Sequence, residues 1–371
     1  MKRIGAIDIF RGMCIFYMTF GHMMEWWLDE ANIWGYDIIW NFGAVVGGGG
    51  FLLVSGMSAA ISYRSRTSKF EQGLGTFSKK AIRNEYMIRA VEILIISFMW
   101  NIGGVLSGLV PTGIEGIWLW FVIQTISISL ILAWPLLKVS RHIRVIICFA
   151  CWIGNEFVFL LLSPYQDQAN LQGILFYILY NEPKQNAIIA YFPFLLMGTV
   201  LGDLLFDILS EDDQKKQSDM IKRRIFIPSL LGGIPLIIFG ATFLFPAFGS
   251  KETFSSHMFI FGIELLLFSG LLWLKDVRSY SPKKSYRLFY YYSYYSFTIF
   301  LAHNLLIFIF PRIFNMITIW FVIVPLMTLW TILFRYIHTK YGTDASVKVQ
   351  ISRIATGLTK KIENKRVKND N

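Results

Sequence analysis

Residues 4–27 read IGAIDIFRGMCIFYMTFGHMMEWW, a stretch long and apolar enough to cross a bilayer as one helix. It nevertheless contains Asp8, Arg11 and His22. Arg11 and His22 are eleven residues apart, or three helical turns plus roughly 20°, so both lie on one helix face, about 16 Å apart along the axis. Ionisable groups at membrane depth usually face a polar interior or a water-filled cavity. The stretch therefore predicts a first membrane span that lines a polar path.

The whole chain has the composition of a polytopic membrane protein. Its 371 residues are 55% hydrophobic and only 16% charged, a balance that soluble proteins of this length do not have. The run 171–180 is too short to span and is expected at the membrane interface. The sequence predicts an all-α integral membrane protein with about ten transmembrane helices, at residues 4–27, 38–63, 87–110, 114–137, 143–162, 186–209, 225–245, 258–274, 288–310 and 313–336.

The basic residues fall on one side of these predicted helices. If the N-terminus is cytoplasmic, every one of the 35 Lys and Arg residues lies in an inside segment except Arg11, Lys184, Lys251 and Arg312. This distribution follows the positive-inside rule and predicts that both termini are cytoplasmic. It also explains the net charge of +11, because these loops meet an anionic leaflet and need no nucleic acid as partner.

No internal repeat or second soluble domain is visible in the sequence. We expect one membrane domain, residues 1–341, followed by a basic cytoplasmic tail, residues 342–371, that is amphipathic or disordered. The three cysteines fall within apolar runs, and Cys148 and Cys151 form a CxxC with no other thiol or His pair close in sequence. Small core residues are therefore expected there rather than a metal or redox site.

His22 and Arg11 are the candidate catalytic residues. Imidazole titrates near neutral pH, so a histidine can take a proton from a hydroxyl or an amine as a general base. The alternative is that His22 only hydrogen-bonds a neighbouring helix. Its alignment with Arg11 favours the functional role.

A second cationic group precedes and enters the third predicted span, where residues 78–94 read SKKAIRNEYMIRAVEIL. Its Lys79, Lys80, Arg83 and Arg89 can hold the phosphates of a cytoplasmic nucleotide-bearing donor. The alternative is ordinary inside charge, which explains Arg89 least well because Arg89 lies further into the apolar run.

Other polar residues lie inside the predicted spans. The glycine run 47–50, followed by Ser55, allows either close helix packing or the approach of a ligand. Gln124, Glu264 and His303 are further candidates for a substrate contact or a structural role. Glu264 has no basic partner in its own span, so we expect it to be protonated or paired with a cation of another helix.

The stretch 7–22, IDIFRGMCIFYMTFGH, resembles the first-helix motif of the transmembrane acyltransferase superfamily, with Arg-x10-His and an Asp three residues before the Arg. That superfamily includes the acyltransferase-3 proteins and the heparan-alpha-glucosaminide N-acetyltransferase-like proteins. The Arg-x10-His stretch is the most specific part, and the resemblance spans nearly the whole chain. Later helices of the superfamily resemble GGFLLVSGMSAA, MIRAVEIL, WLWFVIQTISISLIL, YFPFLLMGTVLGD and YSYYSFTIFLAHNLL.

The resemblance implies transfer of an acyl group, usually acetyl, from a cytoplasmic donor such as acetyl-CoA to a sugar on the far side of the membrane. By it, His22 is the catalytic base, Arg11 and Arg89 hold the donor, and Asp8 orients Arg11. Acetyl-CoA is then a co-substrate, with no permanently bound cofactor and no metal. One motif of the heparan enzyme, Trp-Asn-Gly with a downstream Asp, is only half present as Trp40-Asn41, so a glucosaminide acceptor is left open.

The leading hypothesis is a membrane O- or N-acyltransferase that acts on a cell-envelope glycan or glycolipid, in the cell membrane. The donor enters against the cations of the 78–94 stretch, and His22 deprotonates the acceptor or briefly carries the acyl group itself. The second hypothesis is a proton-coupled transporter or flippase with a relay of intramembrane polar residues. A non-catalytic scaffold leaves the Arg11–His22 alignment unexplained. A homo-oligomer is compatible with all three.

Overall fold

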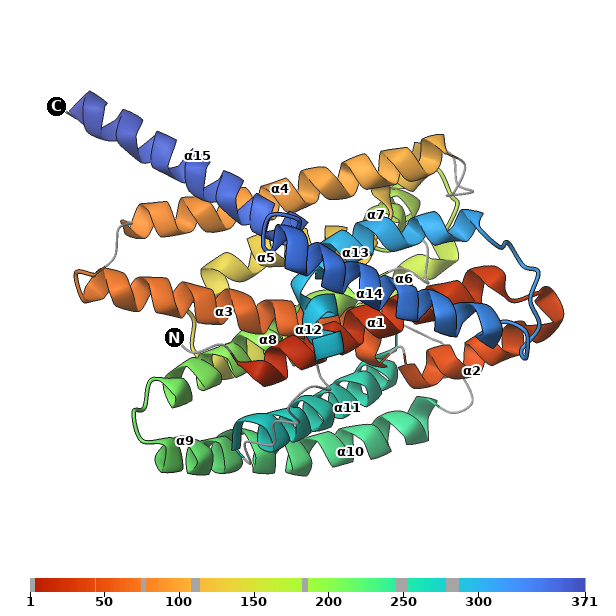
Figure 1. Ribbon diagram of the computed structural model, residues 1–371, viewed down its shortest axis with the longest axis horizontal. Coiled ribbons are helices and arrows are strands. Elements are labelled where there is room, and N and C mark those ends of the chain that lie inside the picture. Colours follow the sequence, from red (N-terminus) through yellow and green to blue (C-terminus); the bar gives the residue numbers. More distant parts are fainter. Residues whose placement is uncertain are drawn as a thin grey trace.

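The computed structural model describes residues 4–43, 45–74, 78–107, 114–181, 186–244, 253–277 and 287–370. Helices account for all the regular secondary structure in these ranges, and most run side by side along the long axis of the molecule (Figure 1). They are α1 (Gly5–Trp27), α2 (Ile33–Gly43), α3 (Gly50–Glu71), α4 (Lys79–Leu106), α5 (Val122–Leu136), α6 (Arg141–Leu162), α7 (Leu171–Leu179), α8 (Ile188–Leu209), α9 (Gln214–Ile221), α10 (Ile227–Leu244), α11 (Phe254–Leu272), α12 (Arg287–Tyr294), α13 (Ser296–His303), α14 (Trp320–Tyr341) and α15 (Val347–Asp370).

Six of the described helical segments are long and apolar enough to cross a membrane. α1 and α3 are of similar length but are not among the six, because charged and small polar side chains lower their hydropathy. The prediction of an all-helical, multi-pass membrane protein is confirmed, whereas the count of ten spans and the cytoplasmic termini stay predictions. The six segments are Lys79–Leu106, Arg141–Tyr165, Ile188–Leu209, Gln214–Phe243, Phe254–Lys275 and Trp320–Tyr341.

Four of the predicted spans are not continuous helices. In the predicted span 114–137 a 3-10 turn, Ile114–Trp118, precedes α5, and in the predicted span 313–336 the helix begins only at Trp320. Within the predicted span 38–63, α2 ends at Gly43 and the backbone of Gly47 is non-helical, with φ −73° and ψ −117°, before α3 begins. Consecutive glycines are poor helix propagators, which accounts for the break. The predicted span 288–310 is divided into α12, α13 and a 3-10 turn, Asn304–Phe308. The prediction of one unbroken helix in each place is wrong.

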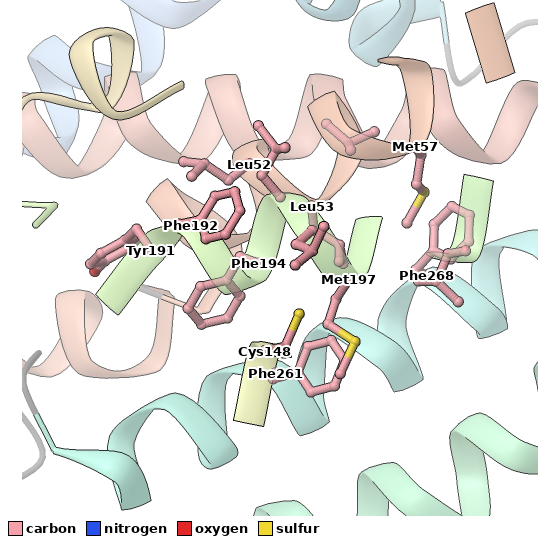
Figure 2. Close-up of a cluster of buried hydrophobic side chains, with 14 of the residues drawn as sticks. Leu52, Leu53, Met57, Cys148, Tyr191, Phe192, Phe194, Met197, Phe261 and Phe268 are labelled. Carbon is pink, nitrogen blue, oxygen red and sulfur yellow. The ribbon is translucent and has the colours of Figure 1, made fainter. Parts of the chain in front are cut away.

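α3 and α8 pack backbone to backbone at the centre of the molecule. A Cβ added at Gly56 would lie 1.9 Å from the Leu195 carbonyl oxygen, and one added at Gly198 would lie 2.0 Å from the Leu53 carbonyl oxygen. Around this contact, apolar side chains of α3, α6, α8 and α11 gather in one core (Figure 2). The small residues of this helix could allow close helix packing or the approach of a ligand, and Gly56 serves close packing.

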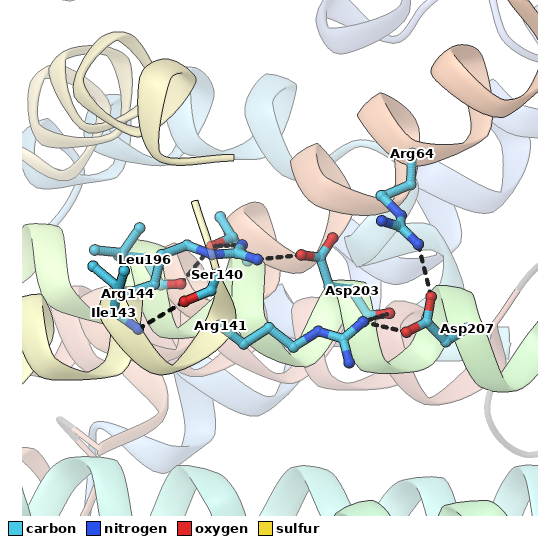
Figure 3. A network of polar contacts seen from close by, with 9 residues as sticks. Arg64, Ser140, Arg141, Ile143, Arg144, Leu196, Asp203 and Asp207 are labelled. Atoms are coloured by element: carbon cyan, nitrogen blue, oxygen red, sulfur yellow. Dashed lines mark hydrogen bonds and ion pairs between the residues drawn. The ribbon is translucent and has the colours of Figure 1, made fainter. Parts of the chain in front are cut away.

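Ion pairs join α8 to its neighbours α3 and α6. Arg144 of α6 pairs with Asp203, and both side chains are almost fully buried, at 2% and 7% exposure. Asp207, one turn further along α8, pairs with both Arg141 and Arg64 (Figure 3). We call these five residues the α8 charge cluster. It neutralises basic residues that the sequence assigns to the cytoplasmic side of the membrane.

Candidate functional site

A cavity of about 740 Å³ lies among α1, α3, α4, α5, α13 and α15. Its lining includes hydroxyl groups and aliphatic and aromatic side chains, but none of its described lining residues is Asp or Glu. A space of this size and composition is complementary to a long molecule with anionic and apolar parts. Five lining residues are cationic, namely Arg11, Arg89, Lys348, Arg353 and Lys360.

Arg11 is buried, and residues of α1 and α3 contact its guanidinium. Its Nη1 lies 3.8 Å from Asp8 Oδ1, and its Nη2 donates to the hydroxyl of Ser58 on α3. The Ser293 hydroxyl of α12 in turn donates to Asp8 Oδ1 at 3.2 Å. The structure thus places Asp8 where it can orient Arg11, and it presents the guanidinium to the cavity.

Of the four cations predicted to hold a donor on the third span, only Arg89 lines the cavity. Lys79, Lys80 and Arg83 lie in the first turns of α4 with exposed side chains, outside the lining residues. Among the residues that the structure describes, Arg89 forms no ion pair. Glu85 lies four residues before Arg89 on the same helix, but it pairs with Arg66 of α3 instead.

His22 lies beyond the cavity, near the C-terminal end of α1, in a chain of polar contacts. Its Nδ1 is 3.0 Å from Glu25 Oε2, and its ring stacks on Trp26 with centroids 5.1 Å apart. Burial raises the pKa of Tyr36, and the negative charge of Glu25 adds to this shift, so the phenol stays protonated and can donate to Glu25. The His22 side chain is 28% exposed, so it is accessible from outside the helix bundle.

His303 is the second histidine at this end of the bundle. Its ring centroid lies 5.3 Å from that of His22 and 5.9 Å from that of Trp26. Its Nδ1 is 2.7 Å from the Phe300 carbonyl oxygen, to which it donates. The structure therefore brings together two histidines that are far apart in the sequence, although His303 is buried and His22 is not.

The other polar candidates have different surroundings. Ser55 lines the cavity and donates to the Phe51 carbonyl oxygen at 2.7 Å. Gln124 is buried away from the lining and accepts from Asn101 Nδ2 at 3.0 Å, which ties α5 to α4. Glu264 is buried beside the glycine run, and neither of its oxygens has a hydrogen-bond partner among the described residues.

The glycine run makes room for Glu264. A Cβ added at Gly49 would lie 2.6 Å from Glu264 Oε1, so a larger residue there would collide with the carboxyl group. The side chains of Trp40 and Asn41, the half-motif of the heparan enzyme, lie outside the described residues.

Sequence reasoning missed Glu25, Tyr36 and the cavity-lining cations of α15. Glu25 follows His22 at i+3, a spacing that puts two side chains on one helix face, so it could have been found. The cations of α15 carried no comparable signal, because their place in the cavity depends on how α15 packs against α4.

Comparison with known protein families matches residues 3–242 to the family described as heparan-alpha-glucosaminide N-acetyltransferase, catalytic. The matched part contains Arg11, His22, Ser55, Arg89 and Gln124. Glu264, His303 and the whole of α15 lie outside it. No curated protein matches the chain.

Proposed function

Because the chain belongs to the heparan-alpha-glucosaminide N-acetyltransferase catalytic family, we propose that it transfers an acetyl group from cytoplasmic acetyl-CoA to a sugar of a cell-envelope glycan. Family membership supports a membrane acetyltransferase. The donor, the acceptor and the roles of individual residues are our proposal.

The observation that carries the donor assignment is that Arg11 and Arg89, 78 positions apart, line one cavity without an acidic lining residue. Guanidinium groups bind phosphate in a bidentate manner and keep their charge in poorly solvated sites. The hydroxyl groups of α3 and the apolar side chains of α4 and α5 suit the pantetheine arm and the acyl chain. In this proposal the acyl-CoA lies in the cavity with its thioester directed along α1.

The base in this proposal is His22. Glu25 accepts from Nδ1–H and fixes the imidazole, which leaves the Nε2 lone pair to accept a proton. Tyr36 holds Glu25 in turn. The same logic of a base oriented by a carboxylate operates in acyl transfer on unrelated folds. Asp8 acts as a positioning residue for Arg11.

Two chemical routes fit this arrangement. In the direct route, His22 removes the acceptor proton, the acceptor oxygen or nitrogen attacks the thioester carbonyl, the C–S bond breaks and CoA leaves as the thiolate. In the second route, His22 Nε2 attacks the thioester carbonyl, the C–S bond breaks and CoA leaves as the thiolate. The acceptor then attacks the acetyl-imidazole, the C–N bond to His22 breaks, and the released imidazole takes the acceptor proton. Both routes require His22, because the base or nucleophile is the same imidazole.

The test is transfer of radiolabelled acetyl from acetyl-CoA in proteoliposomes that carry a glycan acceptor. We expect His22→Ala to lower transfer by about 10²- to 10⁴-fold, the usual contribution of a general base, while CoA still binds. The control is His142→Ala, because His142 is an exposed histidine on α6 away from the cavity lining.

Two results would count against the proposal. Unchanged transfer by His22→Ala would remove His22 as the base. A folded wild-type protein that neither binds nor hydrolyses acetyl-CoA would overturn the acyltransferase assignment itself.

A further inference from the structure

α15 is attached to the helix bundle along its length. The Val347 amide donates to Thr298 Oγ1 of α13 at 3.1 Å, and the Thr356 hydroxyl donates to Glu85 Oε1 of α4 at 3.1 Å. Nearer its C-terminal end, Glu363 accepts from the Ser78 hydroxyl. Figure 1 shows α15 crossing over α4 toward the end of the bundle where α4 begins. The helix is therefore a wall of the bundle, although the sequence assigns it to a separate tail.

The central anchor of α15 is a buried carboxylate. Glu85 is 1% exposed, and its two oxygens bind different helices, Oε1 the Thr356 hydroxyl and Oε2 the Arg66 guanidinium of α3. A buried ionised group needs such partners, since leaving it unpaired would be costly. Glu85 thus joins α3, α4 and α15 next to the cavity and holds α15 in place.

Two faces of α15 have different compositions. Lys348, Ser352, Thr356 and Lys360 recur every four residues, so they form one stripe, and all four line the cavity. A second stripe, on the exposed side, is apolar and consists of Ile354, Leu358 and Ile362. A helix that only lay on an anionic leaflet would direct its cations outward, as α15 does with Lys361 and Lys365, which are exposed and not among the lining residues.

The cavity-facing cations of α15 also connect to the predicted donor site on α1. Lys348 Nζ donates to the Ser293 carbonyl oxygen at 3.4 Å, and the hydroxyl of the same serine binds Asp8, the partner of Arg11. Lys360 is three turns further along α15, about 18 Å away along the helix axis. The cavity-lining stripe of α15 therefore begins beside Arg11, with Lys348, and extends toward the end of the bundle where α4 starts.

We propose that the three cavity-lining cations of α15, Lys348, Arg353 and Lys360, bind the phosphate groups of the acyl-CoA nucleotide, which makes α15 part of the donor site. This inference rests on the proposed function and deepens it. Arg11 and Arg89 then bind these phosphate groups from the α1 and α4 sides of the cavity. Asp344, the partner of Arg353, competes for that cation until phosphate binds.

The experiment compares two double variants that each remove two positive charges from the same helix. One is Lys348→Gln with Lys360→Gln, which changes the cavity side, and the other is Lys361→Gln with Lys365→Gln, which changes the exposed side. CoA affinity is measured by titration calorimetry on the full-length protein in detergent, at one ionic strength because screening alters charge effects. S-acetylpantetheine, which has the thioester but no phosphate, is measured by competition with CoA.

We expect the cavity-side variant to bind CoA at least about tenfold more weakly, with its affinity for S-acetylpantetheine unchanged. The exposed-side variant should match wild type for both ligands. Equal CoA affinities in the two double variants would overturn this inference and leave the proposed function standing, as would an equal loss for S-acetylpantetheine. A wild-type protein that binds no CoA would overturn the proposed function and this inference together.

Discussion

Two groups of arginines in the helix bundle have opposite surroundings. In the α8 charge cluster, Arg64, Arg141 and Arg144 each pair with an aspartate of α8. On the α1 and α4 walls of the cavity, Arg11 lies at the longer distance of 3.8 Å from Asp8, and Arg89 forms no ion pair among the described residues.

The difference separates structural charge from charge that can bind a ligand. A guanidinium whose donors are already satisfied by carboxylates contributes to packing and offers little to an anion. A cavity lined by five cations and no acidic residue attracts one. All of these residues are arginines on helices of one bundle, so their partners distinguish the two roles.

The largest effect on stability is expected from Asp203→Asn in the α8 charge cluster. The change leaves Arg144 buried without its counter-charge, and breaking such a pair costs about 3–5 kcal/mol. The free energy of unfolding in mixed micelles measures the loss. As a control, Asp219→Asn removes an exposed partner of Arg223 and should cost less than about 1 kcal/mol. Equal stability of Asp203→Asn and wild type would show that Arg144 is well solvated.

Arg89→Gln should separate binding from stability. We expect an unchanged unfolding transition and a CoA affinity about 10- to 100-fold lower, since a charged hydrogen bond to phosphate is lost. Arg89→Lys should restore part of the affinity, because an ammonium keeps the charge but not the bidentate geometry. Titration calorimetry measures both variants, with Arg223→Gln as an exposed control.

Unaltered CoA affinity in Arg89→Gln would contradict the contrast between the two groups of arginines. A proton-coupled carrier would give another pattern, in which ligand binding persists and its pH dependence changes.

The smallest effect is expected from Arg64→Gln, at the edge of the α8 charge cluster. Its side chain is 41% exposed, and Asp207 keeps Arg141 as a partner, so the cost should be below about 1 kcal/mol. The same unfolding measurement applies. A loss as large as that of Asp203→Asn would mean that the whole cluster behaves as one buried unit.

The sequence predicted the first helix well because its signals are local. Span length, the spacing of Asp8, Arg11 and His22, and the family resemblance can all be read within one stretch. The match to the family over residues 3–242 confirms that resemblance. The roles assigned to these residues stay predictions.

Other features depend on contacts that the sequence does not display. Lys79, Lys80, Arg83 and Arg89 look alike as a basic cluster, and only their position and orientation on α4 place Arg89 alone in the cavity wall. α15 has the composition of a solvated tail, yet a hydrogen bond to the buried Glu85 fixes it against α4. The sequence showed the glycine run 47–50 but did not indicate that it would interrupt the helix at Gly47.

The close contact between α3 and α8 has a consequence for how the cavity fills and empties. With Gly56 and Gly198 this near to facing carbonyl oxygens, no side chain separates the two backbones where the helices cross. We therefore expect α3 to be a stationary wall during turnover. Admission of a bulky donor and release of the spent one would fall to α4, α5 and α15, whose contacts around the cavity are made by side chains that can part and re-form.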